Sequence, residues 1–310
     1  MTSLPGSGSS AGVGFRARSG QGEMASHPYP VVLSCFHTGP LLQAREQGLD
    51  RAFASLDLGL TSCEVGLTAE GVILPGRGTL PWEEVEAVAG DELACFEVQD
   101  AQAIPIRCFS EELNRFYSLM PTRGAPTLLV SGIPMHRIQG TDPQRDTRAK
   151  VQTIAPLVGR VLDTCTGLGY TAIQAARTAE QVVTIELDPL VLEVARLNPW
   201  SAGLFGDARI VQVVGDAYDV VAGLEDGRFS RIVHDPPMFS LAGDLYSGAF
   251  YRELWRVLRR GGRLFHYIGD LDSRSGHGVA RGVVRRLQEA GFSQVNRKPA
   301  AFGVVAYKAA

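Results

Sequence analysis

The sequence predicts an α/β protein with a doubly wound, mostly parallel sheet of seven strands, preceded by a smaller α+β domain. From about residue 151, short apolar runs alternate with helical patterns, which is typical of parallel sheets flanked by helices. Between residues 31 and 130 the apolar runs are shorter and are punctuated by Gly or Pro, which favours hairpins. We therefore expect domains over residues 31–130 and 131–310, after a Gly- and Ser-rich segment over 1–30 that we expect to be disordered.

The elements of the second domain follow from this alternation. Each expected strand is a short apolar run, and most are followed by a helical pattern within a few positions. The expected strands cover residues 160–164, 182–186, 208–214, 230–234, 262–267, 294–297 and 303–308. The expected helices cover residues 171–179, 189–198, 217–224, 248–260 and 278–290. Ligands bind such sheets at the carboxyl ends of the strands, so the site is expected there.

In the first domain, the sequence patterns that predict strands and helices are shorter. Strands are expected over residues 31–33, 96–98 and 104–108, with hairpins in the region 55–80. Helices are expected over residues 41–50, from Pro81, and over 110–117, where Ser110 is a candidate N-cap. The composition of this domain indicates no chemistry.

Composition excludes several classes of protein. Hydrophobic residues make up 45% and charged residues 20% of the chain, and no apolar run reaches the roughly 18 residues of a membrane span. The five cysteines are scattered and form no CxxC pair, so we expect neither a metal site nor a disulfide framework. We therefore expect a cytoplasmic protein with reduced thiols, no metal and no membrane partner.

The net charge of −3 argues against a strong nucleic-acid binder, but the charge is unevenly distributed. Residues 251–300 contain 11 Arg or Lys and 4 Asp or Glu. Such a stretch attracts phosphates, which would suit an RNA partner. The alternative is that these arginines line the solvent faces of two amphipathic helices.

The segment Asp163-Thr-Cys-Thr-Gly167-Leu-Gly169 lies between an expected strand and an expected helix. Its two glycines allow the backbone to approach a ligand, and the helix N-terminus offers unpaired N–H groups. The GxGxxG pattern of dinucleotide sites is absent, and Asp163 would repel a pyrophosphate. The loop therefore favours a ligand that carries a cation, such as an amino acid or a sulfonium group.

Carboxylates also end the next two expected strands. Glu186 is placed to accept the two ribose hydroxyls of a nucleoside, and Asp188 follows it at the start of a helix. Asp216, which precedes Ala217, is placed to accept an adenine amino group. The alternative for both Asp188 and Asp216 is a helix N-cap.

Together these three motifs resemble the class I S-adenosylmethionine-dependent methyltransferases. The resemblance implies that Asp163 and the backbone from Gly167 to Gly169 hold the methionine end of the cofactor. It also implies that Glu186 holds the ribose and that Asp216 holds the adenine. Further candidate contacts of the cofactor are Cys165, Asp188, Ala217 and Asp235. Cys165 departs from the pattern, because these enzymes usually have glycine there. A small buried thiol is the commoner role for such a cysteine, so a reactive role for Cys165 is the less favoured alternative.

A fourth motif, His234-Asp-Pro-Pro-Met-Phe239, ends the fourth expected strand. It resembles the DPPY signature of methyltransferases that modify planar amino nitrogens, mainly in nucleic-acid bases. Hydrogen bonds to Asp235 and to the Pro236 carbonyl would aim such a nitrogen at the methyl group, and Phe239 would stack on the base. Met238 stands where the aromatic residue usually does, which puts stacking in doubt. The alternative is a structural turn.

The chain also resembles a set of predicted methyltransferases from archaeal genomes. The segments that carry this resemblance are 131–137, the loop at Asp163, Asn198-Pro-Trp-Ser and the motif at Asp235. It implies that Cys165 is a family trait, and it supplies no acceptor. The polar segment 131–150 is a candidate lid over the cofactor, or else a linker. The sequence leaves open whether His136 or His234 is catalytic.

We therefore predict a methyltransferase that uses S-adenosylmethionine and acts on an amino nitrogen, with a base in RNA as the candidate acceptor. Two alternatives stay open. One is an aminopropyl transferase of the polyamine synthase kind, which would use the decarboxylated cofactor. The other is a non-catalytic module that binds a nucleoside.

Overall fold

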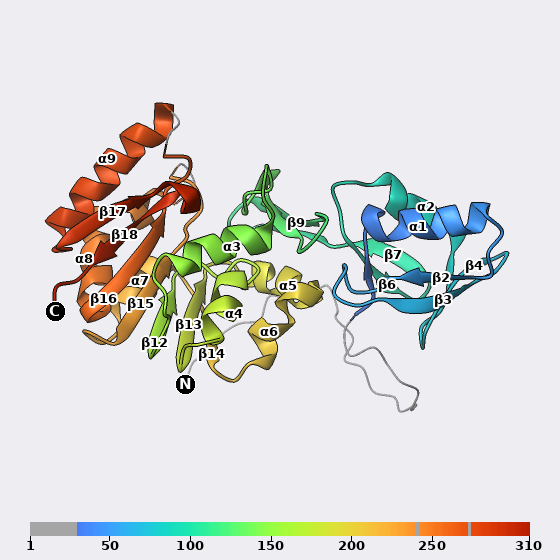
Figure 1. Cartoon of the computed structure of the whole chain (residues 1–310), viewed down its shortest axis with the longest axis horizontal. Helices are drawn as coiled ribbons and strands as arrows, with labels where there is room; N and C mark the ends of the chain where they lie inside the picture. Colours follow the sequence, from blue (N-terminus) through green and yellow to red (C-terminus); the bar gives the residue numbers. More distant parts are fainter. Residues whose placement is uncertain (1–29, 240–241, 272–273) are drawn as a thin grey trace, which may run out of the picture.

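The computed structural model describes residues 30–239, 242–271 and 274–310, and the segment 1–30 that was expected to be disordered lies almost entirely outside them. The molecule is elongated (Figure 1). Small antiparallel sheets occupy one end, a large sheet occupies the other, and strand β9 (Arg115–Met120) lies between them.

The N-terminal end is built from two antiparallel sheets and two helices. One sheet has the order β2-β3-β4-β5, and the other has the order β1-β6-β7. Helices α1 (Cys35–Glu46) and α2 (Trp82–Gly90) pack with them around a common apolar core. The strands are β1 (Val32–Leu33), β2 (Arg51–Ala54), β3 (Cys63–Leu67), β4 (Gly71–Leu74), β5 (Gly78–Pro81), β6 (Phe96–Gln99) and β7 (Gln102–Pro105).

A third antiparallel sheet connects the two ends, and here one expectation from the sequence was wrong. Residues 110–117 form no helix: β8 (Arg107–Ser110) turns back into β9, and Asn114 lies in the left-handed region with φ of 50°. The Ser110 hydroxyl accepts from the Leu113 N–H within this turn. The sheet continues with β10 (Thr127–Val130) and β11 (Ile133–Pro134), so a domain boundary after Val130 would divide a hairpin.

The large sheet has the order β14-β13-β12-β15-β16-β18-β17, and its first five strands are parallel. The predicted doubly wound, mostly parallel sheet of seven strands is therefore confirmed. Its strands are β12 (Arg160–Asp163), β13 (Gln181–Glu186), β14 (Ile210–Val214), β15 (Phe229–His234), β16 (Leu258–Tyr267), β17 (Gln294–Lys298) and β18 (Gly303–Tyr307). Its helices are α3 (Pro143–Gln152), α4 (Tyr170–Ala176), α5 (Pro189–Leu197), α6 (Ala202–Gly206), α7 (Ala217–Ala222), α8 (Gly248–Val257) and α9 (Arg274–Glu289), with short 3₁₀ turns η1 (Pro199–Ser201), η2 (Gly243–Tyr246) and η3 (Pro299–Ala301).

Helices cover both faces of this sheet because successive strand residues point to opposite sides. In β12, Val161 packs in one core cluster and Leu162 in the other. The first cluster contains residues of α3 to α6, and the second contains residues of α7 to α9. With both faces buried, the central strands contain consecutive apolar residues, which explains why the sequence predicted them.

Candidate functional site

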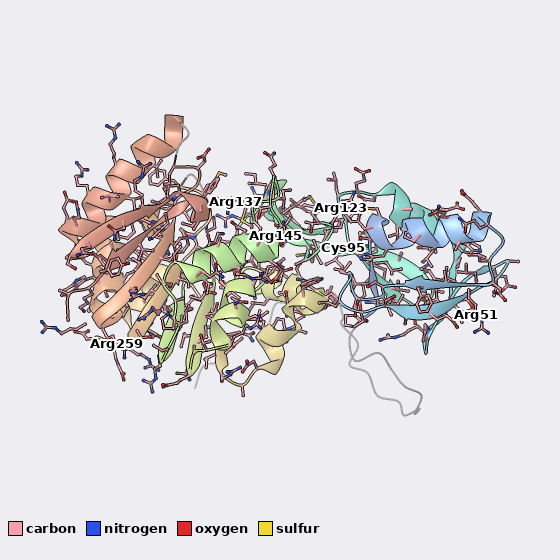
Figure 2. The ribbon with its side chains drawn as sticks, viewed as in Figure 1. Arg51, Cys95, Arg123, Arg137, Arg145 and Arg259 are labelled. Carbon is pink, nitrogen blue, oxygen red and sulfur yellow. The ribbon has the colours of Figure 1, made fainter. Side chains whose placement is uncertain are left out.

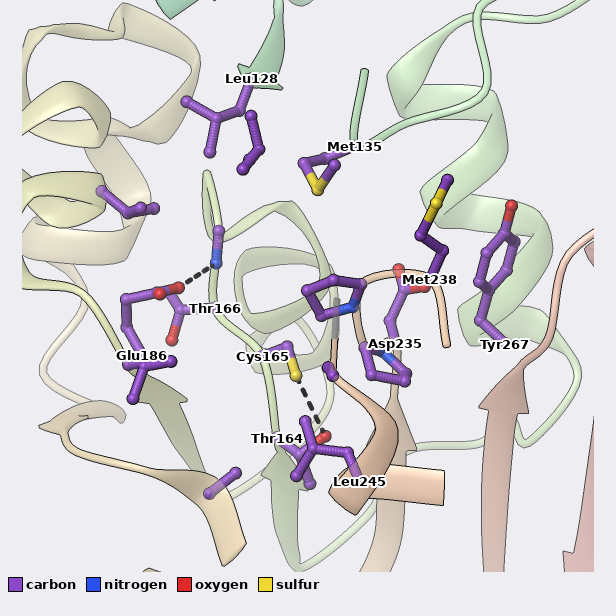
Figure 3. Close-up of a pocket in the computed structure, with 18 of the residues that line it drawn as sticks. Leu128, Met135, Thr164, Cys165, Thr166, Glu186, Asp235, Met238, Leu245 and Tyr267 are labelled. Carbon is purple, nitrogen blue, oxygen red and sulfur yellow. Dashed lines mark hydrogen bonds between the residues drawn. The ribbon is translucent and has the colours of Figure 1, made fainter. Parts of the chain in front are cut away.

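A cavity of about 720 Å³ lies at the carboxyl ends of the parallel strands (Figure 3). Its floor is formed by the loops that follow β12, β13, β14 and β15. Its roof comes from the connecting sheet, with Tyr117, Leu128 and Met135 among the lining residues. The size is within the usual range of small-molecule sites.

The loop after β12 curves around the cavity. Gly167, with φ of 51°, lines the wall, and a Cβ there would meet no atom within 4 Å. Its N–H donates to Glu186 Oε2 at 2.8 Å, a contact drawn as a dashed line in Figure 3. Gly169, with φ of 76°, is not on the wall, and a Cβ there would lie 2.7 Å from Leu204 Cδ2. Gly167 therefore leaves space for a ligand, whereas Gly169 permits close packing of the helix that follows.

Asp163 lies behind this loop and is fully buried. Its Oδ2 accepts from the hydroxyls of Thr171 and Thr184, both at 2.9 Å. Burial raises the pKa of this carboxyl to about 7. Its Oδ1 is buried without a hydrogen-bond partner among the described residues. In this structure the carboxylate thus supports the loop from below and does not line the cavity.

Of the other predicted cofactor residues, some line the cavity and one lies off its wall. Glu186 lines the cavity, and its Oε1 accepts from the Asp188 N–H at 3.2 Å. Burial raises the pKa of the Glu186 carboxyl. Asp188 itself is off the wall and caps α5 by accepting from the Leu190 N–H. Asp216 caps α7 in the same manner and, with Ala217, also lines the cavity, so both of its suggested roles are compatible with its position.

Cys165 lines the cavity between the loop and the fourth-strand motif. Burial raises the pKa of its thiol well above the usual value, and its Sγ lies 3.8 Å from Thr164 Oγ1. A protonated thiol is a poor nucleophile, so the position suits a packing role.

The motif after β15 forms the other side of the cavity. Asp235, Pro236, Met238 and Phe239 all line it. The Tyr246 hydroxyl donates to the Pro237 carbonyl at 3.0 Å, which holds the turn in place. In Figure 3, Asp235 lies between Cys165 on one side and Met238 and Tyr267 on the other.

Sequence reasoning missed three charged residues behind Asp235. Lys150 Nζ donates to Asp235 Oδ2 at 2.6 Å and also forms an ion pair with Asp146 at 2.8 Å. Asp146 in turn accepts from Arg137 Nε at 2.5 Å. The only local signal was the spacing of Asp146 and Lys150, four positions apart on an expected polar segment. Nothing local connected either of them to Asp235.

The two histidines in question are both neutral. Burial lowers the pKa of His234 to about 3; its Nδ1 accepts from the Thr164 hydroxyl and its Nε2 donates to the Leu245 carbonyl. His234 is fully buried and does not line the cavity. His136 does line it, and burial lowers its pKa to about 3 as well. Neither imidazole is therefore charged near neutral pH.

Comparison with known proteins gives a matching domain family and a relative that matches most of the chain. Residues 162–266, which run from the end of β12 to near the end of β16, match the methyltransferase domain family. An uncharacterized protein of Methanocaldococcus jannaschii is 43% identical over 235 residues, which are 75% of this chain and 80% of that protein. The chain belongs to the same family as that protein.

Other relatives match shorter segments. Putrescine N-methyltransferase 4 of Nicotiana tabacum is 31% identical over 100 residues, 31% of this chain and 26% of that enzyme. The polyamine aminopropyltransferase of Aeropyrum pernix is 34% identical over 91 residues, 28% of this chain and 29% of that enzyme. Spermidine synthase from Thermotoga maritima is similar in structure, with a TM-score of 0.52 at 18% identity, over 64% of this chain and 70% of that chain. At this sequence identity, the structural similarity to spermidine synthase shows a similar fold only.

The cofactor of the domain is S-adenosylmethionine, and the residues of the cavity fit it. The open space above Gly167 admits a ligand, and Glu186 offers a carboxylate oxygen at the carboxyl end of β13. The described helices include none that is long and apolar enough to cross a membrane. Within the same described residues, no cluster of three or more His, Cys, Asp or Glu could hold a metal ion.

Proposed function

We propose that this protein transfers the methyl group of S-adenosylmethionine to an amino nitrogen. The observation that carries the proposal is the position of Asp235 on the wall of the same cavity that Gly167 and Glu186 line. A carboxylate there is placed to accept a hydrogen bond from an incoming N–H group. The partial match to a putrescine N-methyltransferase, over 100 residues, supports nitrogen as the acceptor atom.

The cofactor, when bound, supplies an electrophilic methyl carbon that the nitrogen lone pair attacks while the C–S electron pair remains on sulfur. The protein's own work is alignment. Glu186 and the Gly167 backbone hold the nucleoside and amino-acid ends, with Asp216 and Ala217 beside the adenine. Asp163 braces the loop, and Asp188 fixes the start of α5. Asp235 and the Pro236 carbonyl orient the acceptor N–H, and solvent takes the proton after transfer.

The acceptor that we favour is a planar amino group such as that of an RNA base. Phe239 is about half exposed at the cavity mouth, where its ring can contact a flat acceptor. Arg281 and Arg285 on α9 are exposed, although Arg285 is paired with Glu289, and they are candidate contacts for phosphates. Their position is equally that of the solvent face of an amphipathic helix, whose other face buries Val283 and Leu287.

The test is to incubate the protein with methyl-labelled cofactor and with separate pools of RNA, DNA and small metabolites. We expect label in one pool, and we expect Glu186→Ala to weaken cofactor binding in calorimetry at least tenfold, since a buried hydrogen-bonding partner is lost. Glu193→Ala, on the exposed side of α5, is the matched control. Unchanged affinity in Glu186→Ala would refute the assignment of the cofactor site. Transfer to no pool would favour a non-catalytic nucleoside-binding module.

A second candidate is aminopropyl transfer from the decarboxylated cofactor. The partial match to a polyamine aminopropyltransferase favours it, as do Asp244 and Asp270, which add acidic groups to the cavity wall. Calorimetry with both forms of the cofactor discriminates between the reactions. Tighter binding of the decarboxylated form, together with transfer to a diamine, would replace our leading proposal.

A further inference from the structure

Four charged side chains form a continuous chain from the edge of the cavity roof to its floor. Arg137 Nε donates to Asp146 Oδ1, Asp146 Oδ2 pairs with Lys150, and Lys150 donates to Asp235 Oδ2. Figure 2 shows Arg137 beside helix α3, which carries Asp146 and Lys150. The signs alternate along the chain, so each charge lies next to the opposite charge and the four sum to zero.

The centre of this chain is almost completely removed from water. The Lys150 side chain is 1% exposed and that of Asp146 is 0% exposed, whereas Asp235 is 17% exposed toward the cavity. A buried ammonium is costly unless it is fully paired. Lys150 has two carboxylates within 2.8 Å, and its Nζ lies 4.4 Å from the centre of the Tyr267 ring. The two carboxylates raise the pKa of Lys150, so it stays an ammonium and cannot serve as a base.

Asp235 is thereby held at one oxygen and open at the other. Its Oδ2 is occupied by Lys150, and its Oδ1 has no hydrogen-bond partner among the described residues. Lys150 itself does not line the cavity, whereas Asp235 and Tyr267 do. Any effect of Lys150 on a substrate must therefore pass through these two side chains.

We propose that Lys150 is a positioning residue, which fixes Asp235 as a carboxylate with Oδ1 aimed at the acceptor nitrogen. This inference rests on the proposed function, because it assigns Asp235 to the acceptor. Asp146 and Arg137 complete the arrangement: Asp146 anchors the ammonium from the far side, and Arg137 balances the charge of Asp146. An oriented carboxylate costs no reorganisation when the acceptor arrives.

The arrangement predicts shifts of opposite sign for two variants. Burial raises the pKa of Asp235, Lys150 lowers it, and Asp146 raises it. Lys150→Met removes the cation that opposes the effect of burial, so the pKa of Asp235 should rise further. Asp146→Asn removes a neighbouring negative charge and leaves Lys150 to Asp235 alone, so the pKa should fall. Both can be measured by carbon NMR of labelled aspartate carboxyls, with the Asp235 signal assigned from its loss in Asp235→Asn.

The matched control is Lys308→Met. The Lys308 ammonium is also held by protein oxygens, the carbonyls of Trp255 and Leu258, but it is not among the residues that line the cavity. This variant should leave the Asp235 titration unchanged. If Lys150→Met does not fold, Asp146→Asn and Lys150→Arg still test the proposal. Lys150→Arg should keep the titration of Asp235 near that in the parent protein.

Transfer kinetics provide the second readout once an acceptor is found. Lys150→Met should lower kcat about tenfold to a hundredfold and move the acidic limb of the pH profile upward, while the KM for the cofactor stays the same. Lys150→Arg should recover part of the rate. The NMR titration requires no acceptor, so it separates the two claims. An unmoved Asp235 titration in folded Lys150→Met would overturn the effect of Lys150 on Asp235. Absence of transfer by the unmodified protein would refute the proposed function and, with it, the assignment of Asp235 to an acceptor nitrogen, but would leave the effect of Lys150 on Asp235 standing.

Discussion

At the scale of single residues, Asp163 and Glu186 end neighbouring strands but differ in what surrounds their carboxylates. Glu186 lines the cavity and accepts from two backbone N–H groups. Asp163 is enclosed by two threonine hydroxyls under the loop. The same residue class at the same kind of position therefore lines the cavity in one case and braces the loop in the other.

The raised pKa of Asp163 makes folding depend on pH. Its value is about 7 in the folded protein and about 3.9 in an unfolded chain. Between these values the unfolded chain loses the proton while the folded protein keeps it, so stability falls as pH rises, and above about 7 the cost is constant. Asp163→Asn lacks this cost and keeps an oxygen for both threonines. Its stability relative to the parent should therefore improve from pH 5 to pH 8 by up to about 3 kcal/mol, at about 1.4 kcal/mol per unit.

Urea unfolding of both proteins at the two pH values measures this difference. Asp207→Asn is the control, because Arg209 holds the pKa of Asp207 at about 2, below the whole window. The difference in free energy of unfolding between Asp207→Asn and the parent protein should not change between pH 5 and pH 8. A pH-independent difference for Asp163→Asn would mean that Asp163 is already ionised in this range.

At the scale of elements, the turn from β12 into α4 depends on Gly169. This residue is left-handed, and the nearest Leu204 carbon would lie 2.7 Å from an added Cβ. Gly169→Ala should cost about 2–4 kcal/mol, from the strained backbone and the overpacking together. Gly206→Ala, at the end of α6 with open space around the added atom, should change stability by less than about 1 kcal/mol. Urea midpoints compare the two, and equal midpoints would contradict the role of close packing.

The expected helix over residues 110–117 illustrates why local signals fail at this scale. Ser110 followed by Glu111 and Glu112 has the composition of a helix start, yet the segment is a turn between paired strands. The β8–β9 pairing adds ladder hydrogen bonds that a short isolated helix cannot match. Tertiary pairing thus overrode the local preference.

At the scale of the whole molecule, the N-terminal sheets and the methyltransferase domain share one core cluster. Trp200 in η1 donates from Nε1 to the Leu58 carbonyl at 2.9 Å, and Tyr170 donates to the Pro126 carbonyl at 2.9 Å. Val32 and Leu58 belong to the same apolar cluster as the first helices of the methyltransferase domain. The roof of the cavity is therefore held by contacts across the boundary that the sequence suggested.

Trp200→Phe tests this connection. It keeps an aromatic ring but leaves the Leu58 carbonyl without its donor, so we expect a loss of about 1–2 kcal/mol in urea unfolding. Trp255→Phe is a matched control, because the Trp255 Nε1 is buried and has no hydrogen-bond partner among the described residues. Trp255→Phe should lower the free energy of unfolding by less than Trp200→Phe does. Equal losses would indicate that the Trp200 hydrogen bond contributes nothing to the connection.

The sequence by itself determined the seven strands, five of the seven helices beside them and the carboxylates at the strand ends, whereas α3 and α6 were not predicted. These follow from local periodicity, because a strand buried on both faces must be apolar over consecutive residues. It also placed Glu186, Asp216 and Asp235 on one edge, since carboxyl ends of parallel strands share an edge.

Only the tertiary structure decided which atoms face the cavity. Asp163 lies behind the loop, and Lys150 pairs with Asp235 across a separation of 85 residues. No local pattern encodes that pair, because its geometry depends on how α3 packs against the sheet. The physical reason is general: periodicity fixes the direction of a side chain within its element, whereas its partners depend on how distant elements pack.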